Sequence, residues 1–158
     1  MKQAFEWLRV RARGFLQHKS SQPPALIPVR VVALVVEPSD RDLLRAAATT
    51  NQWHIAFANS AAEAQTLLTK SQVPVLVCDR DLLAPDWGSD VEQLSAVSPR
   101  TCILLVSKVA DEYLWNEVVR RGGYDVLYKP LQQDELIRGV KLAWTYNSSA
   151  IRKVPFTK

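Results

Sequence analysis

The amino-acid sequence predicts one α/β domain, in which a doubly wound sheet of five parallel strands is flanked by five helices. Short apolar runs rich in β-branched residues alternate with helical patterns from residue 29 to residue 147. This alternation favours parallel strands joined by right-handed crossovers. The composition is 47% hydrophobic and 23% charged, which suits a packed core that needs neither a disulfide nor a metal for stability.

The expected strands are short apolar runs. The first is almost wholly apolar apart from Arg30, as a central strand covered on both faces would be. Proline or a charged residue follows most of these runs and ends the strand. The five expected strands cover residues 29–36, 53–58, 73–78, 101–106 and 124–128.

Serine, glycine and proline set the expected limits of the helices. We expect the first helix to end near Thr50 and the second near Lys70. A polar loop over 80–88 precedes a short third helix. The fourth helix covers 110–121 and stops at Gly122-Gly123, and the last covers 132–147. Three serines followed by an acid have capping-box spacing: Ser39 with Asp42, Ser60 with Glu63, and Ser89 with Glu92.

Residues 1–28 differ from the rest of the chain in charge and pattern. They hold five basic residues and one acidic residue, whereas residues 29–158 hold 15 of each. Apolar residues at spacings of three and four predict an amphipathic helix over 3–18, and a Pro-rich linker follows over 20–28. We therefore expect a basic leader over 1–28, one domain over 29–147 and a C-terminal tail over 148–158.

Three roles are open for the leader helix. It could pack on its own domain or on a second copy, lie on an anionic membrane surface, or dock on a partner protein. The neutral domain offers no cluster of basic residues for a nucleic acid, so we expect no nucleic-acid partner.

The sequence also favours a cytoplasmic protein that is not an enzyme. Cys78 and Cys102 lie in apolar runs, as buried thiols in a reducing compartment do, and no transmembrane stretch or secretory signal is evident. A Gly-rich phosphate loop and a nucleophile elbow are both missing, and Ser107 has no histidine near it on the expected sheet edge.

Polar residues follow four of the expected strands. Glu37 follows the first and Asp79 the third, while Ser107 and Lys129 follow the fourth and fifth. In doubly wound sheets the functional site lies outside the carboxyl ends of the strands. Two carboxylates and a lysine are therefore expected to converge at one edge.

On these residues the chain resembles the receiver domain of two-component response regulators over about residues 29–147. The resemblance implies a flavodoxin-like strand order, 2-1-3-4-5, and a cis peptide bond before the proline of the Lys-Pro pair. The motifs that carry it are Glu37 after strand one, Val-Cys-Asp-Arg-Asp-Leu around Asp79, Leu-Leu-Val-Ser-Lys around Ser107, and Tyr-Asp-Val-Leu-Tyr-Lys-Pro-Leu around Lys129.

The resemblance implies a role for each of these residues. Asp79 matches the phosphoacceptor, and Lys129 matches the lysine that neutralises the phosphoryl group. Glu37 matches the first of two acids that hold Mg²⁺ with the acceptor. Loss of one carboxylate lowers Mg²⁺ affinity sharply, so no cofactor is assigned, and any Mg²⁺ at Glu37 and Asp79 is expected to bind weakly.

Three positions depart from the receiver pattern. Pro38 stands where the second acid is expected, and Asp40 or Asp81 would compensate only if the loops bend inward. Val106 stands at the hydroxyl position, with Ser107 next to it as a possible substitute. Val126 replaces the switch aromatic. This pattern is typical of a degenerate receiver, or pseudo-receiver.

Two functions follow from the resemblance. The first is a stand-alone signalling module that binds protein partners without phosphorylation, where Asp79 and Lys129 form a structural ion pair. The second is a single-domain regulator that accepts a phosphoryl group from a histidine kinase on Asp79. Its partner would be that kinase or a downstream signalling protein. Tyr113 and Trp115 mark the expected partner face, formed by helix four, strand five and helix five, and this face or the leader could also form a homodimer.

Overall fold

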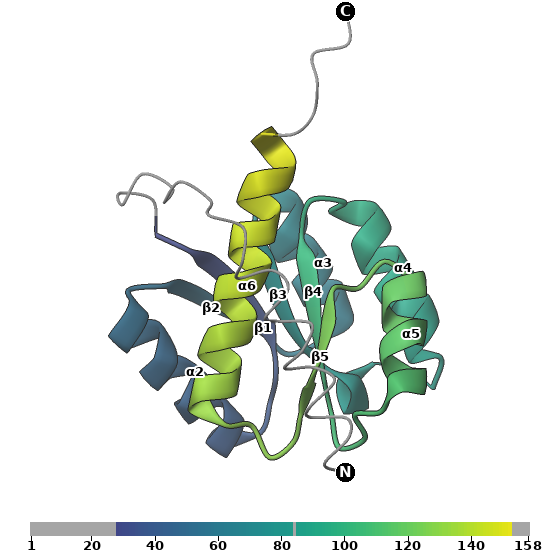
Figure 1. Ribbon diagram of the computed structural model, residues 1–158, viewed down its shortest axis with the longest axis horizontal. Coiled ribbons are helices and arrows are strands. Elements are labelled where there is room, and N and C mark those ends of the chain that lie inside the picture. Colours follow the sequence, from purple (N-terminus) through teal and green to yellow (C-terminus); the bar gives the residue numbers. More distant parts are fainter. Residues whose placement is uncertain (1–27, 84, 153–158) are drawn as a thin grey trace, which may run out of the picture.

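A computed structural model describes residues 28–83 and 85–152 and confirms the predicted α/β fold (Figure 1). Its five strands form one parallel sheet in the order β2-β1-β3-β4-β5, as the resemblance implied. The predicted leader helix over 3–18 and most of the linker lie outside the described residues. The strands are β1 (Arg30–Leu34), β2 (His54–Ala58), β3 (Val75–Asp79), β4 (Cys102–Ser107) and β5 (Asp125–Tyr128).

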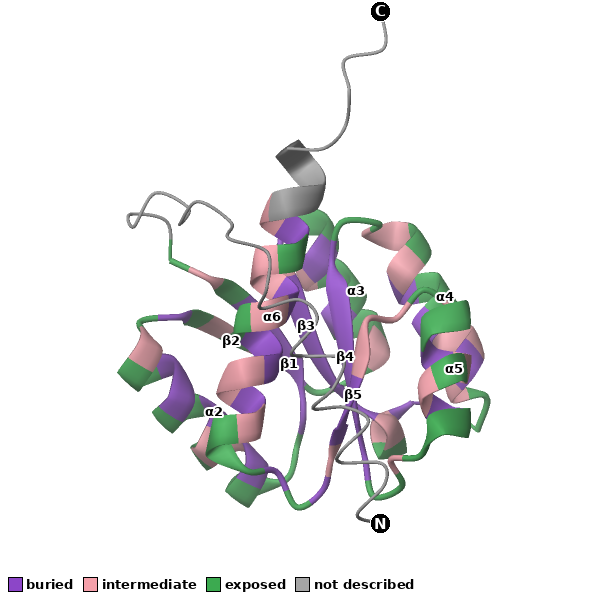
Figure 2. Cartoon of the chain, in the orientation of Figure 1, coloured by how far each residue is buried: buried purple, intermediate pink, exposed green. Residues whose placement is uncertain are grey.

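Helices cover both faces of the sheet (Figures 1 and 2). Successive residues of a strand point to opposite faces, so Val31 packs with α2 and α6 while Val32 packs with α3, α4 and α5. The central strands β3 and β4 are buried along their whole length. The helical elements are α2 (Pro38–Asn51), α3 (Ala61–Lys70), the 3₁₀ turn η1 (Arg80–Leu82), α4 (Trp87–Val97), α5 (Glu112–Arg120) and α6 (Gln133–Arg152).

Three predicted helix starts were wrong. Helix α5 begins at Glu112 and not at Ala110, because the Asp111 side chain caps it by accepting a hydrogen bond from the Leu114 backbone N–H at 2.8 Å. Helix α2 begins at Pro38, not after Ser39, because proline fits the first helical turn without losing a hydrogen bond. Helix α4 begins at Trp87, because the Asp86 side chain caps it by accepting a hydrogen bond from the Ser89 backbone N–H at 3.2 Å. The Ser39–Asp42 and Ser89–Glu92 pairs are therefore not capping boxes.

Other limits also moved. All five strands begin one or two residues later than predicted. Helix α6 continues past the predicted end at Asn147 to Arg152, since no glycine or proline interrupts it there. In the described part of the chain, no helix combines the length and the apolar character needed to cross a membrane. Cys78 and Cys102 are free and buried, as predicted.

The predicted cap at Ser60 is confirmed. Its hydroxyl accepts a hydrogen bond from the Glu63 backbone N–H at 3.1 Å, and the Glu63 carboxylate accepts one from the Asn59 backbone N–H at 2.8 Å. Serine at this position satisfies one of the unpaired N–H groups of the first turn of α3.

Replacement of Ser60 by alanine is expected to lower the free energy of unfolding by about 1 kcal/mol. The matched control is Ser39→Ala, also at an exposed serine of a helix start, where no side-chain cap forms. Urea unfolding of both variants checks the assignment. Equal losses at Ser39 and Ser60 would contradict it.

Candidate functional site

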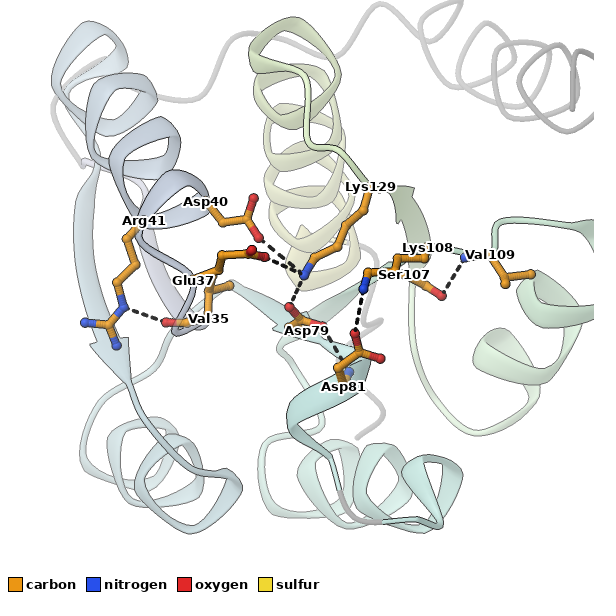
Figure 3. Close-up of polar contacts among 10 residues, drawn as sticks. All are labelled: Val35, Glu37, Asp40, Arg41, Asp79, Asp81, Ser107, Lys108, Val109 and Lys129. Atoms are coloured by element: carbon orange, nitrogen blue, oxygen red, sulfur yellow. Dashed lines mark hydrogen bonds and ion pairs between the residues drawn. The ribbon is translucent and has the colours of Figure 1, made fainter.

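The carboxyl ends of the strands bring four of the predicted residues to one edge of the sheet (Figure 3). Asp79 is the last residue of β3 and Ser107 the last of β4. Lys129 follows β5, and Glu37 lies between β1 and α2. The Lys129–Pro130 peptide bond is cis, as the resemblance implied.

Lys129 lies at the centre of this edge. Its ammonium donates a hydrogen bond to Oδ2 of Asp79. The same Nζ lies 3.3 Å from Oδ2 of Asp40 and 3.5 Å from Oε2 of Glu37. Lys129 and Asp79 are only 8% and 4% exposed, and Asp40 is 8% exposed. One ammonium is therefore shared by two buried carboxylates and one exposed carboxylate (Figure 3).

The surroundings of Lys129 keep it charged. Burial by itself would lower its pKa, because it removes water from the ammonium. The hydrogen bond and the charge of Asp79, followed by the charge of Asp40, outweigh this effect. The pKa of Lys129 is consequently raised from its ordinary value of 10.5.

Both carboxylate oxygens of Asp79 have partners. Oδ2 accepts from Lys129, and Oδ1 accepts from the Asp81 backbone N–H at 2.9 Å. The second bond caps η1, the turn that follows β3. Asp79 thus connects this turn to the lysine after β5.

Asp40 is the residue of this site that sequence reasoning left as a conditional substitute. It was expected to contribute only if a loop bent inward. It enters instead because α2 begins at Pro38, which makes Asp40 the third residue of the helix and not the first, and there it lies buried against Lys129. The signal that could have found it is the proline itself, which is common at the first position of a helix.

Asp81, the other conditional substitute, does not join the cluster. Its carboxylate lies 4.0 Å from Nζ of Lys108, and both side chains are largely exposed. Such an exposed pair contributes little to stability. Asp81 takes part in the site through its backbone N–H alone.

The side chain of Ser107 stabilises the turn after β4. Its hydroxyl accepts a hydrogen bond from the Val109 backbone N–H at 3.1 Å. Val106, at the predicted hydroxyl position, is completely buried in the core between the sheet and helices α2 and α6. Val126, at the predicted switch position, is 2% exposed and packs in the core on the other face. Both valines are packing residues in this structure.

The two aromatic residues of the predicted partner face differ in exposure. Tyr113 is 76% exposed on α5. Trp115 is half-buried and packs against the core under α4 and α5. Tyr113 is therefore the aromatic side chain of this pair that is available to a partner.

The Mg²⁺ ion that the resemblance implies does not fit this arrangement. Across residues 28–83 and 85–152, no group of three or more His, Cys, Asp or Glu side chains lies close enough to hold a metal ion. The carboxylates of Glu37, Asp40 and Asp79 are directed at the Lys129 ammonium instead (Figure 3).

Comparison with known proteins gives matches among solved structures only, since no family model and no curated protein matches the chain. The signal receiver domain of an HD domain-containing protein from Pseudomonas fluorescens Pf-5 superposes with a TM-score of 0.72 and 18% identity, covering 85% of this chain and 100% of that one. The chemotaxis protein CheY4 from Vibrio cholerae gives a TM-score of 0.65 and 17% identity, covering 73% and 98%.

The chain also resembles part of a longer protein. NtrX from Brucella abortus gives a TM-score of 0.70 and 18% identity, and the match covers 80% of this chain but 28% of NtrX. At identities of 17–18%, these matches show a shared fold and assign no activity to this chain. The described domain has the CheY-like fold of response-regulator receiver domains.

Proposed function

We propose that this chain is a pseudo-receiver, a cytoplasmic signalling module that acts by binding protein partners without being phosphorylated. The observation that carries the proposal is the cluster at the carboxyl edge. Asp79, the residue that matches the phosphoacceptor, is buried and has both oxygens engaged by Lys129 and by a backbone N–H. With both oxygens engaged, the Asp79 carboxylate connects the turn after β3 to Lys129 and does not act as a nucleophile.

Two core residues support the same proposal. Receiver signalling, as the resemblance implies it, uses a hydroxyl after strand four and an aromatic side chain in strand five. Val106 and Val126 offer neither, and both are packed in the core. A phosphoryl group on Asp79 would therefore lack the partners that pass its effect to the surface.

The binding surface follows from exposure. Tyr113 projects from the first turn of α5, and Val109, 51% exposed, precedes the same helix. Tyrosine is enriched among the residues that anchor protein interfaces. We place the partner surface at the start of α5.

One observation favours phosphorylation of Asp79 by a histidine kinase as the second candidate. Asp40 supplies a buried carboxylate at the edge where the receiver pattern has a second acid and this chain has Pro38. If Lys129 swung away, Asp40 and Asp79 could supply oxygen ligands to a hard cation.

The test is intact-mass spectrometry after incubation with acetyl phosphate and Mg²⁺. In the competing reaction the Asp79 carboxylate would attack phosphorus, form an acyl phosphate and release acetate. We expect no Asp79-dependent gain in mass. Asp79→Asn reports on the acceptor, and Asp81→Asn is the matched control, an exposed acid two residues away.

A phosphoryl mass on the wild-type protein and on Asp81→Asn, but not on Asp79→Asn, would contradict the proposal. A receiver domain that retains both acids after its first strand serves as the positive control for the reagent. The two candidates therefore predict opposite spectra for the same sample.

A further inference from the structure

Three carboxylates, two from the start of α2 and one from the end of β3, meet at a point that Lys129 already occupies (Figure 3). Glu37 precedes α2, Asp40 lies in its first turn, and Asp79 ends β3. Carboxylate oxygens are the ligands that a hard divalent cation prefers, but within the described residues no three such side chains lie close enough together to hold one. In this protein the three carboxylates surround an ammonium nitrogen.

Distances show that the ammonium and a metal ion exclude one another. Mg²⁺ lies about 2.0–2.1 Å from its oxygen ligands. The Nζ of Lys129 lies 3.3 Å from Oδ2 of Asp40 and in hydrogen-bond contact with Oδ2 of Asp79. An ion bound to both oxygens would overlap or closely approach this nitrogen, and the two positive charges would repel. Lys129 would have to leave a site in which it is 8% exposed.

The negative charges of the three carboxylates are stabilised by groups other than a second cation. Asp40 lies in the first turn of α2, where the helix dipole favours a negative charge. Asp79 accepts a backbone N–H through its second oxygen. The Glu37 side chain is 59% exposed and is largely solvated. The buried part of the cluster is thus one ammonium that is hydrogen-bonded to Asp79 and ion-paired with Asp40, whose buried Oδ2 has no hydrogen-bond partner among the described residues.

We infer that Lys129 is the resident cation of this carboxylate cluster, and that Asp40 holds it there together with Asp79, so that the cluster excludes divalent cations. The inference deepens the proposed function and rests on it, because carboxylates occupied by the protein's own ammonium are not free to bind a metal ion for phosphoryl transfer. Asp40 acts as a positioning residue for Lys129.

The experiment measures the thermal unfolding midpoint while Mg²⁺ or Mn²⁺ is added to millimolar concentrations, against NaCl at equal ionic strength. The wild-type midpoint is expected to show no change specific to the divalent ion. Lys129→Met keeps an unbranched apolar side chain as far as the Cε position and removes the charged nitrogen. Its midpoint is expected to rise by several degrees with Mn²⁺, since the carboxylates are released to bind it.

Asp42→Asn is the matched control. Asp42 lies on the same helix as Asp40, but it is 78% exposed and pairs with Arg45. This variant is expected to behave as the wild type. A saturable, divalent-specific rise in the wild-type midpoint would overturn the inference, and so would a folded Lys129→Met protein that does not respond to Mn²⁺.

If Lys129→Met does not fold, Mn²⁺-induced broadening of backbone NMR signals in the wild-type protein gives the answer. Absence of saturable broadening at Asp79 and Asp40 supports the inference, and saturable broadening there overturns it.

Mn²⁺ binding without any phosphorylation by acetyl phosphate would overturn this inference alone. Phosphorylation of Asp79 in the presence of a chelator would overturn the proposed function alone.

Discussion

Replacement of Lys129 by methionine is expected to lower the free energy of unfolding by about 3–5 kcal/mol. The substitution leaves Asp79 and Asp40 as buried carboxylates without their shared ammonium. Breaking a buried ion pair from one side costs far more than the pair contributes when intact, because the remaining charge has no water. Urea unfolding at neutral pH measures the loss.

The matched control for this substitution is Lys108→Met. Lys108 is 76% exposed and lies 4.0 Å from the exposed carboxylate of Asp81, so we expect a change of at most about 1 kcal/mol. Adding Asp79→Asn to Lys129→Met should recover part of the loss, since it removes one of the uncompensated charges. Equal losses at Lys108 and Lys129 would show that the cluster is not buried as described.

The second large effect is a loss of stability at alkaline pH. Burial raises the pKa of the Cys102 thiol from 9.0 to about 12, and burial, followed by the charge of Asp79, raises the pKa of the Cys78 thiol as well. Above pH 9 the unfolded chain therefore releases thiol protons that the folded chain keeps. The unfolded state becomes favoured as pH rises, by up to about 1.4 kcal/mol per pH unit for each thiol.

Lys129 adds to this loss at higher pH. Its pKa is raised in the folded protein, so its contribution is complete below the ordinary value of 10.5 and disappears as pH rises through the folded value. Urea unfolding from pH 8 upward should show stability falling from about pH 9 in the wild type. In a Cys78→Ala, Cys102→Ala double variant the fall should begin only where lysine titrates. An unchanged onset in the double variant would contradict the assignment to the thiols.

The sheet was predictable because its signal is local. The run Val-Leu-Val-Cys that precedes Asp79 in β3 is apolar on both faces, as strands of covered parallel sheets are. Glu37, Asp79 and Lys129 follow predicted strands, and parallel strands end at a common edge of the sheet. Their convergence at that edge was therefore predictable as well.

Asp40 was less predictable, because its position depends on the first residue of α2. A capping box at Ser39 and a helix start at Pro38 both satisfy local rules, and they give Asp40 different orientations. Tertiary contact with Lys129, which is remote in sequence, accompanies the second arrangement. Pro38 indicates the helix start, but the contact between Asp40 and Lys129 depends on the packing of the folded chain.

The sequence pattern also could not predict which aromatic residues of α5 are exposed. Tyr113 and Trp115 are two residues apart, so they lie on different sides of the helix. Which side faces the sheet depends on how α5 packs on the core with β5 and α4. Leu114 and Val118 take the buried positions, which leaves Tyr113 in solvent and Trp115 at the margin.

The most direct test of Lys129 as the resident cation of the carboxylate cluster is NMR detection of its ammonium in protein labelled with ¹⁵N at lysine. A buried ammonium bonded to carboxylates exchanges its protons slowly, so Lys129 should give a signal that Lys129→Met lacks and that exposed Lys108 does not give. We predict that this signal stays in place when Mg²⁺ and acetyl phosphate are added. A saturable shift or loss of the signal on their addition would contradict the account, because it would mean that Lys129 leaves Asp79 and Asp40 to admit a metal ion or a phosphoryl group.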